Sequence, residues 1–90
     1  MKLKRIKNVS WREVDGEGVV LHFKTGAYYS LNEVGLKIWE LCDGKKSVQD
    51  IQSAVTSQYK GERGRVERDV DRFVRQLYKE KLIERIADRT

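Results

Sequence analysis

Residues 25–44, TGAYYSLNEVGLKIWELCDG, constrain the fold most, because they turn a short aromatic strand directly into a helix. Residues 27–31 read as a strand, since aromatic side chains suit a pleated, half-buried surface. Asn32 then interrupts the strand and is a good N-cap, because its side chain can accept a hydrogen bond from a free N–H of the first helical turn. The helix that follows has one apolar face, and Gly44 predicts its C-terminal end.

Two further strands are predicted before this segment. Residues 11–15 alternate apolar with polar side chains, and residues 19–24 are rich in β-formers. Gly16-Glu17-Gly18 and Thr25-Gly26 mark turns between the strands, and such short connections permit hairpins. The expected result is a three-stranded antiparallel meander.

Two further helices are predicted after it. Ser47, with Asp50 three residues on, is a variant of the capping box and predicts the start of the second helix. Gly61 and Gly64 break the periodic pattern, and residues 65–81 then place apolar side chains along one helical face.

The fold class follows from this order. Three strands precede three helices, and the short segment 82–86, with Leu82, Ile83 and Ile86, predicts a small strand that returns to the body. This is an α+β domain, a β-meander followed by three helices, arranged like a winged helix-turn-helix with the sheet as the wing. Residues 1–90 contain no Pro and no Ser- or Gly-rich linker, so a single domain is expected.

The composition gives little support for catalysis. His22 is the single histidine and has no cysteine or second histidine at metal-ligand spacing, so neither a metal nor a cofactor site is expected. Cys42 lies on an apolar helix face, where a buried thiol is expected rather than an activated thiolate. We therefore expect a protein that is not an enzyme.

The chain also lacks an apolar run long enough for a membrane span or a signal peptide. A lone cysteine cannot form an internal disulfide and suits a reducing compartment. A cytoplasmic protein without a membrane partner is expected.

The predicted third helix carries a cationic stripe, because its basic residues recur at intervals of three and four. They are Arg65, Arg68, Arg72, Arg75 and Lys79. Acidic residues are interspersed, so a solvated face is one reading and an acidic ligand is another. Winged-helix DNA binding is a third reading, although Gln76 is the one base-reading side chain there and the acids oppose phosphate approach.

The third strand offers a different binding hypothesis. In a meander it has a neighbour on one side, so its other backbone edge must be covered or offered to a partner. Tyr28 and Tyr29 point to opposite faces, which leaves one aromatic ring near the surface. A peptide could add itself as a fourth strand and bond to the main chain.

The sequence resembles the PqqD-like family of RiPP recognition elements, small domains that bind the leader of ribosomally made, post-translationally modified precursor peptides. The resemblance spans residues from about Trp11 to Glu84. It rests on an ordered set of motifs: Leu31-Asn32, Ile38-Trp39, Asp43-Gly44, Ser47, Asp69-Val70, Phe73, Leu77 and Leu82-Ile83. One departure is Lys81, which stands in a turn where the family commonly has Gly.

The resemblance implies that a leader peptide lies antiparallel along residues 27–31, between this strand and the third helix. The strand would supply Ala27, Tyr28, Tyr29, Ser30 and Leu31. The helix would supply Asp69, Phe73, Gln76 and Leu77, with Arg65 and Arg72 placed to attract acidic leader residues.

The implied role is to present the precursor to a separate modifying enzyme. That enzyme would be a leader protease and cyclase, as for lasso peptides, or a radical SAM enzyme. Nucleic acid is not the expected partner, and a winged-helix DNA-binding regulator stands as the alternative.

Overall fold

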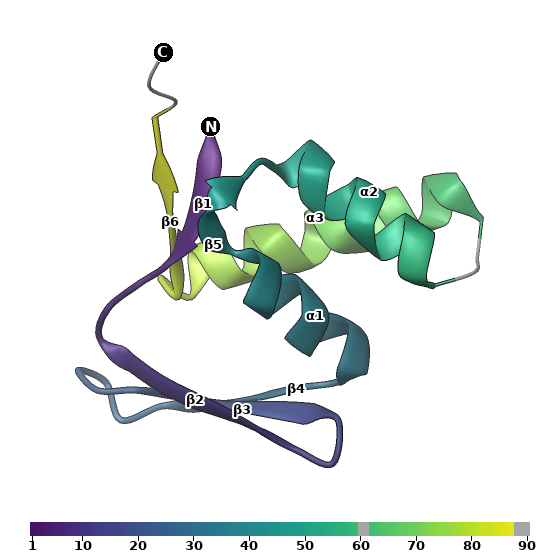
Figure 1. Ribbon diagram of the computed structural model, residues 1–90. Coiled ribbons are helices and arrows are strands. Elements are labelled where there is room, and N and C mark those ends of the chain that lie inside the picture. Colours follow the sequence, from purple (N-terminus) through teal and green to yellow (C-terminus); the bar gives the residue numbers. More distant parts are fainter. Residues whose placement is uncertain (60–61, 88–90) are drawn as a thin grey trace.

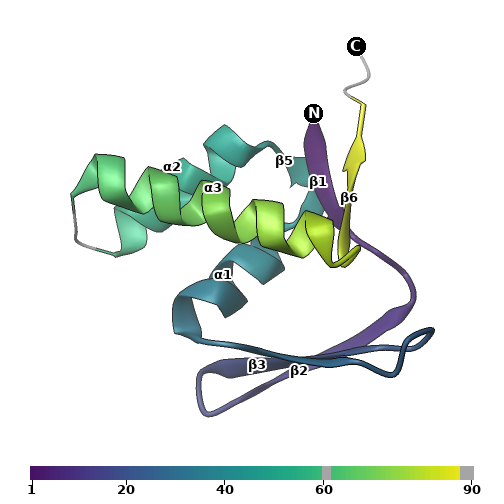
Figure 2. The same ribbon diagram turned by 180° about the vertical axis from the view of Figure 1, so that it is seen from behind.

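The computed structural model describes residues 1–59 and 62–87. The elements follow one another along the chain as β1 (Lys2–Arg5), β2 (Val9–Val14), β3 (Glu17–His22), β4 (Tyr28–Leu31), α1 (Glu33–Leu41), β5 (Asp43–Lys46), α2 (Val48–Gln58), α3 (Arg63–Lys79) and β6 (Ile83–Ile86). Helix α1 lies between the sheet that contains β2, β3 and β4 and the pair of helices α2 and α3 (Figures 1 and 2). The α+β fold class is confirmed.

The predicted meander is present, with antiparallel strands in the order β2-β3-β4. The first turn is Asp15-Gly16, whose φ angles of 52° and 81° are those of a hairpin turn with two left-handed residues. Strand β3 therefore starts at Glu17, before the expected residue 19, and ends at His22. Gly18 lies within β3, where an added Cβ would come 2.8 Å from Leu36 Cδ1. A glycine at this position lets α1 pack closely onto the sheet.

A second antiparallel sheet, in the order β5-β1-β6, was only partly predicted. Strand β6 confirms the expected return at residues 82–86, and it pairs with β1 at Leu3↔Arg85. Strands β1 and β5 were not predicted, because Leu3 is the one apolar residue in KLKR and DGKK contains none. Both strands are held by pairing with segments far away in the chain.

The helix starts agree with the capping analysis. Asn32 Oδ1 accepts a hydrogen bond from the Gly35 N–H at 2.8 Å. Ser47 and Asp50 form a reciprocal capping box, with bonds of 3.2 Å and 3.0 Å. Two expectations about helix ends were wrong. Helix α1 ends at Leu41, before Gly44, and α3 starts at Arg63 and includes Gly64; Gly61 lies outside the described residues.

The corner after α3 contains Lys81, whose φ of 59° places it in the left-handed region. This conformation costs an ordinary side chain of order 1 kcal/mol, and glycine adopts it freely. This geometry explains why glycine suits the position of Lys81, where the PqqD-like pattern commonly has Gly.

The core is centred on Trp39, which has no exposed surface. Its ring meets that of Trp11 edge to face, with centroids 6.2 Å apart. The Arg5 guanidinium donates hydrogen bonds to the carbonyl oxygens of Trp39 and Glu40 at 2.9 Å and 2.8 Å. A cation at the C-terminus of α1 satisfies carbonyls that the helix leaves free and complements its dipole.

Candidate functional site

The open edge of β4 is the first component of the site. Strand β4 ends the sheet, so one of its edges pairs with β3 and no strand of the described chain pairs with the other. The His22 N–H donates to the Ala27 carbonyl at 3.0 Å, and hydrogen-bonded pairs recur at every second residue of an antiparallel ladder. Tyr29 and Leu31 therefore direct their N–H and C=O groups to β3. Tyr28 and Ser30 direct theirs outward.

The side chains of β4 alternate between the solvent-exposed face of the sheet and the face that packs on the body. Tyr28 is 71% exposed and Ser30 is exposed, whereas Leu31 is buried in the core at 4% exposure. Tyr29 and Ala27 are half-buried. Leu31 was expected to help line a binding pocket. Because its side chain is buried in the core, it can contribute only by packing beneath β4.

The second component is the face of α3 that carries Asp69, Arg72, Phe73 and Gln76, which line a shallow cavity of about 280 Å³. Helix α3 and strand β4 lie on the same side of the molecule (Figure 2). We call the face of α3 that carries these residues, together with the free edge of β4, the β4–α3 surface. Leu77 faces the core, with 3% of its surface exposed. Arg65 is exposed and lines neither this cavity nor the deeper one described below.

Hydrogen bonds at Glu80 join β4 to α3 at one end of the β4–α3 surface. The Tyr29 hydroxyl donates to Glu80 Oε2 at 3.3 Å, and the Gln76 amide donates to Glu80 Oε1 at 3.1 Å. Burial raises the pKa of Tyr29, and the negative charge of Glu80 raises it further. The phenol therefore stays a neutral donor at physiological pH and holds the strand to the helix.

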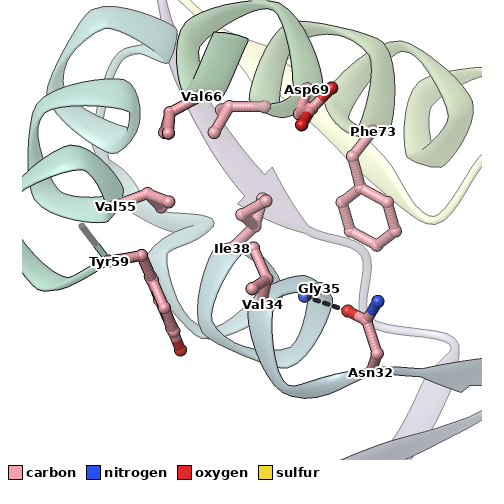
Figure 3. Close-up of a pocket in the computed structure, with 10 residues that line it drawn as sticks. Asn32, Val34, Gly35, Ile38, Val55, Tyr59, Val66, Asp69 and Phe73 are labelled. Atoms are coloured by element: carbon pink, nitrogen blue, oxygen red, sulfur yellow. Dashed lines mark hydrogen bonds between the residues drawn. The ribbon is translucent and has the colours of Figure 1, made fainter. Parts of the chain in front are cut away.

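At the other end, Phe73 packs over the start of α1. A Cβ added to Gly35 would lie 3.0 Å from Phe73 Cζ and 3.2 Å from Asn32 Oδ1. Glycine at this position thus allows the Phe73 ring to settle against the capped helix end, and Figure 3 shows the ring above Asn32 and Gly35.

Beside Phe73 a cavity of about 360 Å³ opens between the three helices. Its walls are mostly apolar, and Val34, Ile38, Val55, Tyr59 and Val66 surround the space (Figure 3). The periodic pattern predicts apolar helix faces, but it does not predict the cavity that these residues line. Gly35, between Val34 and Leu36, was the one sequence signal for a space beside α1.

Basic residues gather on the solvent face of α3, where a groove is lined by Arg68, Asp71, Arg72, Arg75, Gln76 and Lys79. Asp71 is paired with Arg75 at 3.0 Å. The cations outnumber the acids, so the predicted stripe is a real surface feature next to the β4–α3 surface.

Groups capable of chemistry are few. Burial raises the pKa of Cys42 to about 12, so its thiol is protonated at neutral pH and is a poor nucleophile. Within residues 1–59 and 62–87, no cluster of three His, Cys, Asp or Glu side chains could hold a metal ion. The helices described in the structure include none that is long and apolar enough to cross a membrane. The arrangement is suited to binding an extended polypeptide.

Comparisons with known proteins agree with this geometry. The family described as coenzyme PQQ synthesis protein D (PqqD) matches residues 17–83. TbiB1, solved in complex with the TbiA(beta) leader peptide, is 38% identical with a TM-score of 0.82, over 94% of this chain and 99% of that one. Lasso peptide synthetase B1, complexed with the leader peptide, is 25% identical with a TM-score of 0.82, over 94% and 100%.

A third structure, the PqqD truncation of Methylobacterium extorquens PqqCD, is described as a functional, stand-alone RiPP recognition element. It is 19% identical with a TM-score of 0.72, over 92% of this chain and 88% of that one, and so shares the fold. Among curated protein sequences, no match to this chain was found.

Proposed function

Because the chain belongs to the PqqD family, we propose that it binds the leader segment of a ribosomally made precursor peptide and presents it to a separate modifying enzyme. The observation that carries the proposal is the open edge of β4, on the same side of the molecule as α3, whose Phe73 and Gln76 line a shallow cavity. TbiB1, 38% identical over nearly its whole length, was solved with a leader peptide bound. The proposed domain comprises residues 1–90.

The leader would add itself to β4 as a fourth, antiparallel strand. The N–H and C=O groups of Tyr28 and Ser30 are the protein's share of the new ladder. Each backbone hydrogen bond contributes about 0.5–1.5 kcal/mol net, and this contribution is independent of the leader sequence. The edge thus supplies a common part of the affinity for any extended segment.

Side chains of the leader would supply the rest. Alternate residues of an added strand point towards α3, where the Phe73 ring and the cavity of about 360 Å³ offer apolar surface. A buried aliphatic or aromatic side chain contributes about 1.5–3 kcal/mol before ordering costs. Asp69 and Gln76 can hydrogen-bond polar leader groups, and Arg72 can attract an acidic one. Arg65, further along the helix, would act at longer range.

The partner enzyme is proposed to be a leader protease and cyclase of the lasso type, because two leader-bound relatives are TbiB1 and lasso peptide synthetase B1. A radical SAM enzyme would be served by the same recognition mode. The protein itself would carry out no chemistry and need no cofactor. Its place of action would be the cytoplasm, where precursor peptides leave the ribosome.

A titration with fluorescently labelled TbiA(beta) leader peptide tests the proposal, with a scrambled peptide and a random DNA duplex as controls. We expect saturable binding of the leader, weaker binding of the scrambled peptide and no specific binding of the duplex. Salt-sensitive duplex binding without leader binding would instead favour the winged-helix DNA regulator.

A further inference from the structure

A cavity of about 670 Å³ lies where the two sheets meet, outside the β4–α3 surface. Its walls come from the chain between β1 and β2, the turn between β3 and β4, and the corner between α3 and β6, which lie on one side of the molecule in both views (Figures 1 and 2). Lys24 and Thr25 line it, and one residue, Gly26, separates them from the strand residues that begin at Ala27. The cavity therefore continues from one end of the proposed leader strand.

His22 is the buried polar residue in this wall, with 7% of its surface exposed. Its Nδ1 accepts a hydrogen bond from the Lys24 N–H at 3.2 Å, so the proton of the neutral ring is on Nε2. None of the hydrogen bonds in the described chain uses Nε2. Among residues 1–59 and 62–87, the fully enclosed polar side-chain atoms without partners are Trp39 Nε1 and Thr56 Oγ1. His22 Nε2 is not among them, so it keeps some exposed surface, and His22 lines the cavity.

The charges around this donor favour an anionic ligand. Three lysines, Lys7, Lys24 and Lys81, are among the residues that line the cavity. Of the two acids there, Glu80 already accepts hydrogen bonds from Tyr29 and Gln76. The other acid, Glu84, lies opposite Lys4 in the β1–β6 pair. Within the described part of the chain, none of these lysines forms an ion pair. A buried N–H donor near such cations suits a carboxylate, which gains most from charge-assisted hydrogen bonds.

We propose that this cavity is a second subsite, which binds an acidic side chain of the leader just after the residues that pair with β4. The inference rests on the proposed function, because an antiparallel leader beside β4 has its C-terminal end at Ala27, next to Lys24 and Thr25. His22 Nε2 donates to the carboxylate, and Lys24 and Lys81 balance its charge. The subsite then fixes the direction in which the leader leaves the protein towards its core peptide.

A peptide series tests the subsite. In the TbiA(beta) leader peptide, each residue after the β4-pairing segment is replaced in turn by Glu and by Lys, and affinities are measured by fluorescence anisotropy. At one position Glu should bind about three- to tenfold more tightly than Lys. Lys24→Glu should abolish or reverse that preference, whereas Lys45→Glu, an equal charge change at an exposed site on β5, should retain it.

A His22→Phe variant, checked for folding by thermal melting, should also lose the preference for Glu while still binding the leader. Equal affinity of the Glu and Lys peptides at every position, with leader binding intact, would overturn the subsite and leave the proposed function standing. Failure of the wild-type protein to bind any peptide of the series would overturn both.

Discussion

Proline at position 30 should separate binding through the β4 edge from every other contribution. The Ser30 N–H points away from β3, so Ser30→Pro removes a donor that the fold itself does not use. Proline is tolerated at strand positions whose N–H faces solvent, and the variant should therefore fold. An added leader strand, however, would meet a ring in place of a hydrogen-bond donor, and one of its carbonyl oxygens would lose its partner.

The expected loss can be worked from these contacts. Leaving one polar group unsatisfied in a formed interface costs about 1–3 kcal/mol, which corresponds to about a 5- to 150-fold increase in Kd. The matched control is Glu13→Pro on the opposite edge of the same sheet. The Phe23 N–H bonds to the Asn8 carbonyl at 2.9 Å, so by the same alternation the Glu13 N–H faces away from β3.

The assay is fluorescence anisotropy with labelled TbiA(beta) leader peptide, accompanied by circular dichroism melts of all three proteins. We expect Ser30→Pro to weaken binding and Glu13→Pro to bind like the wild type, with both variants folded. If folded Ser30→Pro keeps wild-type affinity, the leader does not pair with β4. If both variants lose affinity equally, the effect is on the whole sheet and the edge argument fails.

Three further predictions concern other parts of the molecule. Phe73→Ala should weaken leader binding by about 1–3 kcal/mol through lost apolar contact, whereas Tyr78→Ala, an exposed aromatic of the same helix, should bind normally in the same titration; equal losses would remove Phe73 from the site. Lys81→Gly should raise the free energy of unfolding by about 0.5–1 kcal/mol, because glycine adopts the φ of 59° without the steric strain of a side chain. Urea denaturation that shows no gain in stability would mean that the backbone at Lys81 is unstrained. The hydrogen bond from Lys46 is the main cause that lowers the pKa of Asp43 from its ordinary value of 3.8. The stability contributed by ionised Asp43 is therefore complete above pH 3.8 and is lost as the pH falls through the lower pKa of the folded state. Asp43→Asn should flatten this part of the acid denaturation profile, and an unchanged profile would contradict the assignment.

Local signals in the sequence predicted much of the fold. Asn32 and Ser47 cap helices through hydrogen bonds to residues three positions away, so their role is visible in a short window. The meander strands likewise carry their own patterns and turns. Strands β1 and β5 do not, because Leu3 is the single apolar residue between them and their partners are distant in the chain. Long-range pairing is not encoded in local periodicity.

The candidate site divides along the same line. The free edge followed from the meander order, and the outward α3 residues followed from helical spacing. The cavity beside Phe73 could not be predicted in this way. Its walls are apolar residues of the kind that fill a core, and the space remains because the apolar faces of the three helices do not pack completely against one another. For His22, strand alternation predicts the face of β3 on which the side chain lies. It does not predict that Nε2 is left as the available donor, because this depends on the hydrogen bond from the Lys24 N–H to Nδ1.

The shortness of β4 also decides where specificity must come from. The strand runs from Tyr28 to Leu31 and is followed by Asn32, the N-cap of α1, so its outward backbone groups belong to Tyr28 and Ser30 alone. At about 0.5–1.5 kcal/mol each, these bonds cannot by themselves offset the cost of ordering a flexible leader. They also cannot distinguish one sequence from another. Selectivity must therefore come from leader side chains, including those that reach Phe73 and its cavity. A short edge has the further advantage of being a poor template for aggregation.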